Sequence, residues 1–298
     1  MKKFLFIIVS ILLLVSYSSA QIKNGSQKKL AKFYDNQAWE DCAFKAERMI
    51  LLPKNEKDAE IYLYLAASYN KIFLLCIEDQ EYLNSNPEYL ESYTYALKHS
   101  VTAKKRDKKQ KRFFPANDHI LEEIAISGIF YIENYVKVKK KPSKANSYAR
   151  KIMKTYNDDN IYFMHGVLSA MLNDMLTANE VFTEVYHRMD SIQNTAQNIK
   201  PQKTTFYMIE AYDYYAEYML NQEVPKVQEL KDFIEKGLSY YPNNEILLYW
   251  KEKCENPEAD IKKPENKIKN TVLKNATLLN TKEDDEDIEI EEEEETDE

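Results

Sequence analysis

The stretch HGVLSAMLNDMLTANEVF, residues 165–182, predicts two closely packed helices. Its apolar residues recur at helical spacing, yet it includes Gly166, and a glycine inside a helix costs about 1 kcal/mol relative to alanine. A second small residue, Ala178, follows twelve positions later. Two antiparallel helices approach closely only where their facing side chains are small, and such packing offsets the cost of the glycine. We therefore expect a helical hairpin with one small residue on each helix.

The residues around these two positions follow a recognisable order of large and small side chains. The order is Tyr162, His165, Gly166 and Ser169, then Ala178, Phe182 and Val185. It resembles the tetratricopeptide repeat, a 34-residue pair of helices with one small position on each helix. Gly166 and Ala178 match these two positions. The resemblance implies that His165 fills a packing position in the core.

Other segments repeat this pattern less regularly. Ala66, Gly128 and Ala216 match small positions of first helices, and the small positions of second helices fall near residues 42, 96, 145, 178 and 230. Only the interval from 145 to 178 is close to the period of the family. We therefore expect an all-α fold, an α-solenoid of about five degenerate tetratricopeptide-like hairpins over residues 21–255. A closing helix is expected at EILLYWKEK, and the alternative is an irregular helical bundle.

The N-terminus has the features of a secretory signal peptide over residues 1–20. Two lysines precede an apolar run from Phe4 to Val15, and Ser18 and Ala20 are the small residues of a cleavage site. The alternative is an uncleaved anchor, but this run is shorter than the roughly 20 residues that span a bilayer. We expect cleavage after Ala20, no membrane span in the mature chain, and a periplasmic or extracellular location in a bacterial envelope.

The C-terminus differs in composition from the rest of the chain. Residues 283–298 hold thirteen acidic side chains, so they account for the formal net charge of -8, and residues 21–282 are close to neutral. Such a segment buries too little apolar surface to offset the entropy of ordering. We expect residues 256–298 to be a disordered linker and an acidic low-complexity tail.

The sequence disfavours several kinds of chemical site. With only four glycines, no glycine-rich phosphate loop can be drawn. His119 and His187 lack a second nitrogen or sulfur ligand nearby, and we expect no metal ion. No arrangement of Ser, His and Asp indicates a nucleophile, so we expect no cofactor and no enzyme activity. The alternative is a carboxylate-based glycan hydrolase.

Two further features are interpreted as structural. The run KKRDKKQKR, residues 104–112, suggests a solvated loop between helices rather than a nucleic-acid site, because aromatic residues are not interleaved and export is expected. Docking of this run against acidic groups, including the chain's own tail, is the alternative. The cysteines Cys42, Cys76 and Cys254 are too few for a disulfide framework and are expected to be packed thiols.

The family resemblance also implies a binding face along the concave groove of the first helices. With Ala66 and Ala216 in the small positions, the groove would receive Glu60, Asn70, Lys71, Glu210, Asp213, Glu217 and Asn221. The carboxylates at 210, 213 and 217 share one helical face, which predicts an acidic stripe suited to a basic ligand. The alternative is an ordinary solvated helix face.

These expectations combine into one functional hypothesis. We expect an exported, non-enzymatic scaffold or adaptor that binds a protein or a peptide, with a basic segment as the expected ligand, in a cell-envelope assembly. The alternative is a glycan-binding envelope protein that stacks sugars on the exposed members of its 23 tyrosines.

Overall fold

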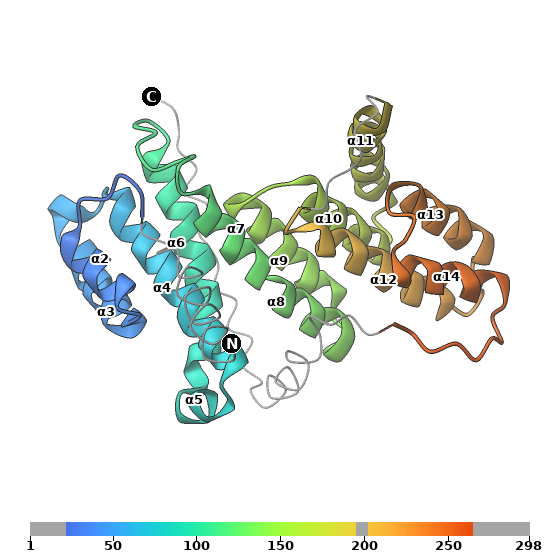
Figure 1. Cartoon of the computed structure of the whole chain (residues 1–298), viewed down its shortest axis with the longest axis horizontal. Coiled ribbons are helices and arrows are strands. Elements are labelled where there is room, and N and C mark those ends of the chain that lie inside the picture. Colours follow the sequence, from blue (N-terminus) through green and yellow to red (C-terminus); the bar gives the residue numbers. More distant parts are fainter. Residues whose placement is uncertain (1–21, 195–201, 265–298) are drawn as a thin grey trace, which may run out of the picture.

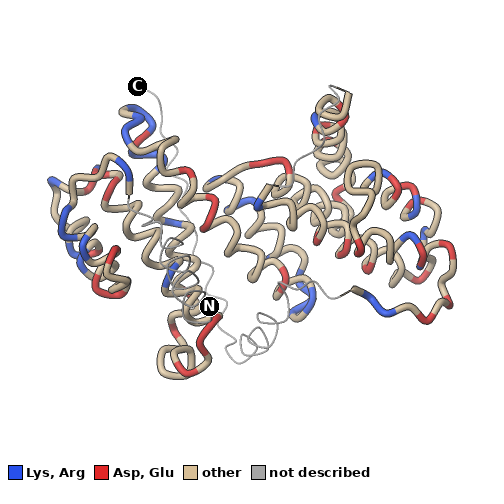
Figure 2. The backbone as a smooth tube through the Cα atoms, viewed as in Figure 1, with Lys and Arg blue, Asp and Glu red and all other residues tan. Residues whose placement is uncertain are grey.

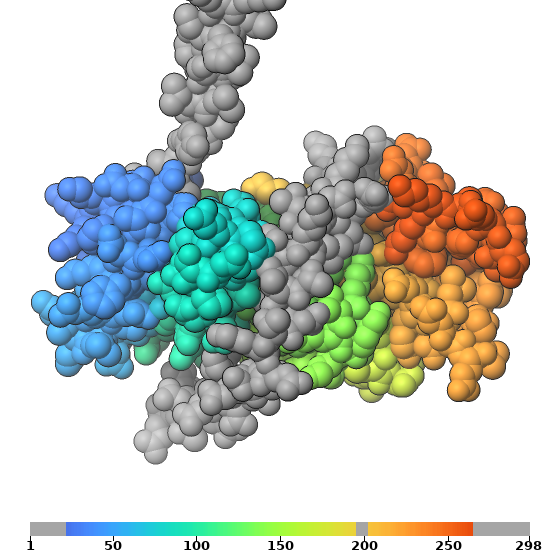
Figure 3. Space-filling model, turned by 90° about the horizontal axis from the view of Figure 1, so that it is seen from below, coloured from blue at the N-terminus to red at the C-terminus, as the bar shows by residue number. Residues whose placement is uncertain are grey.

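The computed structural model describes residues 22–194 and 202–264, and within these two ranges the chain forms helices and no strands. The helices follow one another along the long axis of the molecule, from α2 and α3 at one end to α13 and α14 at the other (Figure 1). The same two ends lie at opposite sides of the space-filling view (Figure 3). The expected all-α fold class is confirmed.

The N-terminal part is built around α4 (Ala59–Glu78), which packs against α3 and α6. Asp58 begins this helix by accepting a hydrogen bond from the backbone N–H of Glu60. By length and hydropathy α4 could cross a membrane, but 72% of its apolar window is buried inside the molecule, as is typical of a core helix. The elements around it are α2 (Lys28–Asp35), α3 (Trp39–Ile50), η1 (Pro53–Asn55), α5 (Gln80–Ser85), η2 (Pro87–Glu91) and α6 (Ser92–Asp107).

The middle part contains an irregular helix followed by a regular one. Gly128 separates α7 from α8, and a π-helical turn, η3, follows. A Cβ atom at Gly128 would lie 2.3 Å from the Tyr93 hydroxyl and from Ile152 Cδ1, so only glycine permits this approach. The elements are α7 (Asp118–Ser127), α8 (Ile129–Glu133), η3 (Asn134–Val138) and α9 (Pro142–Thr155).

Helices α10 (Asp159–Met171) and α11 (Met175–Asn194) contain residues 165–182, where the sequence predicts a helical hairpin. They pack against each other, with Gly166 and Ala178 both buried. A Cβ atom at Gly166 would lie 2.7 Å from Val181 Cγ1 on α11. Asn173 takes a left-handed conformation with φ 62°, and the Asp174 N–H donates to the Ser169 carbonyl, which ends α10 and turns the chain.

The C-terminal part consists of α12 (Thr205–Leu220), α13 (Val227–Tyr240) and α14 (Glu245–Glu255). Helix α12 packs against α10, α13 and α14. Leu247, Trp250 and Cys254 are buried on α14, which is the inner face expected of the closing helix. Many tyrosines belong to the core, and the fully buried ones include Tyr64, Tyr93, Tyr207, Tyr212 and Tyr214.

Only part of the basic run at residues 104–112 lies in a loop between helices. Helix α6 extends to Asp107, so residues 104–107 are its last turn, where cationic side chains interact favourably with the helix dipole. The buried Asp107 carboxylate then accepts hydrogen bonds from the backbone N–H groups of Arg112, Phe113 and Phe114. Figure 2 shows the basic cluster at the tip of α6.

Helix α14 ends at Glu255, directly before the residues expected to form the linker. Residues 256–264 are described, and they lie beside α14 and α12 without forming a helix. The signal peptide and the acidic residues 283–298 lie outside the described residues. The three cysteines are buried and free of disulfide bonds, as expected.

Candidate functional site

The acidic residues predicted on α12 lie together on one face of this helix. Asp213 is fully buried, Glu210 is 3% exposed, and the side chain of Glu217 is 40% exposed. Their positions in the helix, i, i+3 and i+7, bring them onto neighbouring turns. The carboxylates therefore form a stripe that runs from the core to the surface.

Lys137 lies at the buried end of this stripe and comes from the π-helical turn η3. Its Nζ atom is 3.3 Å from Glu133 Oε1, 3.5 Å from Glu210 Oε2 and 3.3 Å from Asp213 Oδ2. The ammonium group also lies 4.7 Å from the centre of the Tyr214 ring. The carboxylates come from α8 and α12 and share the ammonium group of Lys137. Their attraction to this cation offsets part of the cost of burying the charges.

Lys263 reaches the same stripe from the segment that follows α14. Its Nζ atom lies 2.5 Å from Asp213 Oδ1 and 3.8 Å from Glu217 Oε2. It also lies 4.9 Å from the centre of the Trp250 ring. The Trp250 indole Nε1–H donates to Asp213 Oδ1 at 2.8 Å. We call Asp213, Glu217 and Trp250 the lysine cage, because they surround one ammonium group.

The electrostatics keep the buried carboxylate of the cage ionised. Burial by itself would raise the pKa of Asp213, but the ammonium groups of Lys137 and Lys263 and the hydrogen bonds from Lys263 and Trp250 outweigh it. The pKa of Asp213 therefore lies below its ordinary value. Burial and the neighbouring Glu210 raise the pKa of Tyr214 well above its ordinary value, so this ring is neutral beside Lys137.

The other half of the predicted groove is not an open binding surface. Glu60 is 1% exposed, and its carboxylate accepts hydrogen bonds from the backbone N–H groups of Ser26 and Gln27. Asn70 is also 1% exposed, and Lys71 forms an ion pair with Glu123 of α7. The chain's own residues therefore cover Glu60 and Asn70, and Lys71 is paired with Glu123.

The two predicted halves do not meet among the described residues. Helices α4 and α12 lie in different parts of the molecule, with α7, α9 and α10 between them (Figure 1). Asn221 caps the C-terminal end of α12 and is exposed. Only Glu210, Asp213 and Glu217 of the predicted set are brought into one cluster. The small positions Ala66, Gly128, Gly166, Ala178 and Ala216 are all buried in helix contacts.

Four residues of the cluster were not predicted from the sequence: Glu133, Lys137, Trp250 and Lys263. Trp250 was assigned to the inner face of the closing helix, and Lys263 to the linker. Lys137 begins a basic run, KVKKK, which was a visible signal. Its meaning depends on the π-helical turn that orients it, and such a turn has no signature in a single sequence.

The thiols of the core and the side chains of the lysine cage differ in the chemistry that they offer. Burial raises the pKa of the Cys42 thiol to about 11 and that of Cys76 to about 12, which disfavours the nucleophilic thiolate. Within residues 22–194 and 202–264 no group of three His, Cys, Asp or Glu side chains is placed to hold a metal ion. A buried carboxylate, an exposed carboxylate and an indole ring together can bind an ammonium group.

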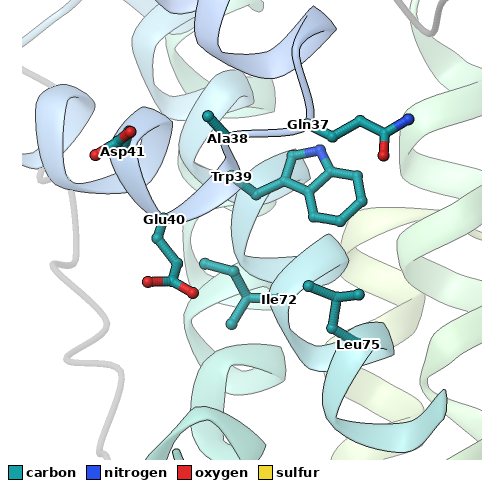
Figure 4. A pocket seen from close by; sticks show the side chains of 7 residues that line it. All are labelled: Gln37, Ala38, Trp39, Glu40, Asp41, Ile72 and Leu75. Carbon is teal, nitrogen blue, oxygen red and sulfur yellow. The ribbon is translucent and has the colours of Figure 1, made fainter. Parts of the chain in front are cut away.

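A second concave feature lies where α3 begins. Gln37, Ala38, Trp39, Glu40 and Asp41 surround a cavity of about 220 Å³ with two residues of α4, Ile72 and Leu75. Figure 4 shows the Trp39 indole beside Leu75 and the Glu40 side chain near Ile72. The Glu40 carboxylate accepts a hydrogen bond from the Tyr82 hydroxyl at 2.7 Å.

Comparisons with protein-family models, curated proteins and solved structures found no match for this chain.

Proposed function

We propose that the chain is an exported, non-enzymatic adaptor that binds a basic segment of a partner protein on the acidic face of α12. In this proposal the helical pairs α2/α3, α4/α6, α7–η3/α9, α10/α11 and α12/α13, with the closing helix α14, form a solenoid that resembles tetratricopeptide repeats. The succession of helix contacts along the chain supports this architecture. The assembly would belong to a cell envelope.

One observation carries the proposal: an extended segment of the chain itself is held on this face by a lysine. Lys263 contacts Asp213 and Glu217 of α12 and Trp250 of α14. Extended segments that present a side chain to a pocket are a common mode of peptide recognition. A lysine in a segment of another protein has the same chemistry as Lys263.

The burial of Glu210 and Asp213 decides how the proposal is tested. Reversing the charge of either residue would place a cation inside the cluster of Lys137, and the fold would suffer. Glu217 is the accessible carboxylate, so Glu217→Lys tests binding with the core intact. Glu235→Lys, on the exposed surface of α13, is the matched control.

The experiment is affinity capture of envelope proteins by the tagged chain, with mass spectrometry of the captured proteins. We expect one defined partner to be captured by the wild type and by Glu235→Lys, and to be lost with Glu217→Lys. Thermal melts of the three proteins establish that each is folded. Equal capture by all three folded proteins, or capture of no partner by the wild type, would refute the assignment of function to this face.

The cavity beside Trp39 favours a second candidate function, the binding of a glycan. Trp39 offers an aromatic surface, and Glu40 offers a carboxylate that can accept hydrogen bonds from sugar hydroxyl groups. The Tyr82 and Tyr89 hydroxyls already lie within 3.5 Å of this carboxylate. Titration of the chain with envelope polysaccharides should then quench tryptophan fluorescence in the wild type and not in Trp39→Ala.

A further inference from the structure

The lysine cage is organised independently of the lysine that occupies it. Asp213 is held from behind, because Lys137 contacts its Oδ2 atom and the Trp250 indole N–H donates to its Oδ1 atom. Lys137 is in turn fixed by Glu133 and by the Tyr214 ring. The carboxylate and the ring therefore keep their positions when Lys263 leaves, which is the property of a preformed binding site.

The contact with Lys263 lies at the open edge of the site. The Lys263 side chain is 31% exposed and that of Glu217 is 40% exposed, whereas Asp213 is fully buried. A ligand can therefore approach from solvent and replace the ammonium group without opening the helices.

The hydrogen bonds that fix the backbone of the segment carrying Lys263 lie near its beginning. Lys253 of α14 donates to the Ala259 carbonyl at 2.5 Å, and the Asn256 N–H donates to the Glu252 carbonyl. Beyond Ala259, no backbone-to-backbone hydrogen bond joins residues 260–264 to a helix within the described part of the chain. This segment can leave the cage while α14 stays in place.

We propose that the lysine cage is a receptor site for the ε-ammonium group of a lysine in an extended segment of a partner protein, and that Lys263 occupies it in the unbound chain. This inference rests on the proposed function and names the group that is recognised. The chain's own residues 256–264 then compete with the partner. A partner must displace them, so binding is restrained until a segment of higher affinity or higher local concentration arrives.

The residues between α14 and Lys263 act as a tether, and their number decides how strongly Lys263 competes with a partner. Lys263 lies eight residues beyond Glu255, the last residue of α14. A short tether gives an effective concentration on the order of 1 mM, so a free peptide with a dissociation constant of about 100 µM would bind roughly tenfold more weakly while Lys263 competes. Removing the Lys263 ammonium group should therefore strengthen the binding of the peptide by the same factor.

The test uses the fluorescence of Trp250 in the full-length chain. The chain has two tryptophans, so Trp39→Phe leaves Trp250 as the single reporter. The probe is a blocked synthetic peptide with the sequence of residues 256–264, NPEADIKKP, and its control carries norleucine in place of the lysine that corresponds to Lys263. The variants in this background are Lys263→Gln and, as the matched control, Lys226→Gln, whose lysine forms an exposed ion pair with Glu229.

We expect Lys263→Gln to bind the lysine peptide about tenfold more tightly than the parent chain and Lys226→Gln do, and not to bind the norleucine peptide. Adding Glu217→Gln to Lys263→Gln should weaken the binding again, and circular dichroism checks that every variant is folded. Equal binding of the two peptides, no binding by Lys263→Gln, or equal affinity of the parent and Lys263→Gln would overturn the inference.

The same variants in the affinity capture separate the two proposals. If Glu217→Lys abolishes partner capture while the peptide does not bind Lys263→Gln, the adaptor function stands and the lysine cage is not its receptor. If the peptide binds as expected and no partner is captured, the cage stands as a lysine site and the adaptor function fails.

Discussion

At the scale of single residues, Gly166 offers the most direct test of the helix pairing. A Cβ atom at this position would lie 2.7 Å from Val181 Cγ1 and 3.2 Å from Phe182, both on α11. Gly166→Leu should separate α10 from α11 and lower the free energy of unfolding by roughly 1–3 kcal/mol or more, and Ala178→Leu should do the same. Urea unfolding measures this loss. Asn179→Leu, exposed beside Ala178, should change little, and a wild-type stability for Gly166→Leu would contradict the pairing.

His99 should make the stability depend on pH. Its ring lies 6.0 Å from that of Tyr62 and 5.9 Å from that of Tyr69, and its Nδ1 atom has no hydrogen-bond partner among the described residues. Burial, with a smaller effect from Lys98, lowers its pKa to about 4. Between pH 6.5 and 4 the unfolded chain therefore binds a proton that the folded chain does not.

The stabilising effect of neutral His99 is complete above pH 6.5 and is lost as the pH falls towards 4. The shift corresponds to at most about 3 kcal/mol. Unfolding curves at pH 7 and pH 5 should show a smaller loss of stability for His99→Phe than for the wild type, whereas the exposed His187→Phe should behave as the wild type. The same loss of stability between pH 7 and pH 5 in all three proteins would show that His99 is not the group responsible.

At the scale of elements, Glu60 of α4 fixes the start of α2. Its carboxylate accepts hydrogen bonds from the Ser26 and Gln27 N–H groups at 2.7 Å and from the Ser26 hydroxyl at 2.9 Å. Glu60→Ala leaves these donors without the acceptor and should cost roughly 2–3 kcal/mol. Hydrogen exchange should show that the amides of residues 26–30 open more readily. Glu78→Ala, at the exposed end of the same helix, is the control and should leave them protected.

The helices could be predicted from the sequence because they depend on a periodic property. Gly166 and Ala178 are recognisable by size and spacing, and EILLYWKEK shows its inner face by the positions of Leu247, Trp250 and Cys254. The candidate site was predicted only in part, since i, i+3 and i+7 spacing brings the α12 carboxylates together whatever surrounds them. Burial, however, depends on which other elements cover a residue.

The partners of those carboxylates come from two segments that have no such periodicity. Lys137 is oriented by the π-helical turn η3, and Lys263 by the turn that Lys253 stabilises after α14. Both turns depend on tertiary contacts rather than on local preference. The burial of Glu60 has the same cause, because its hydrogen-bond donors, Ser26 and Gln27, lie more than thirty positions away in the sequence.

At the scale of the whole molecule, each end of the described chain is attached by a buried carboxylate of a core helix. Glu60 of α4 holds residues 26 and 27, and Asp213 of α12 holds Lys263. The two attachments differ in strength. The N-terminal one includes backbone hydrogen bonds and buried apolar surface, whereas the C-terminal one depends on a partly exposed ammonium group. We therefore expect the C-terminal segment to exchange and the N-terminal segment to remain attached.

The N-terminal attachment also bears on where the signal peptide is removed, although residues 1–20 lie outside the described residues. Ile22 is 3% exposed, and the Lys23 backbone N–H donates to Asn117 Oδ1 at 2.8 Å. Cleavage after Ala20 would leave only Gln21 in front of this attached segment. We expect mass spectrometry of the exported chain to find Gln21 as its first residue. A chain that retains Met1 in the membrane fraction would contradict this prediction.

The position of the cut should matter for stability. A mature chain that begins at Gln21 keeps Ile22 in the core, whereas a variant that begins at Lys23 loses roughly 1.5–3 kcal/mol of apolar burial. A variant that begins at Ser26 should lose more, because the hydrogen bonds between Lys23 and Asn117 and between Asn24 and Arg112 are lost as well. Thermal melts of the three exported forms measure these steps. Identical melting temperatures would show that residues 22–25 contribute nothing to the fold, and would remove the structural reason for a cut at Ala20.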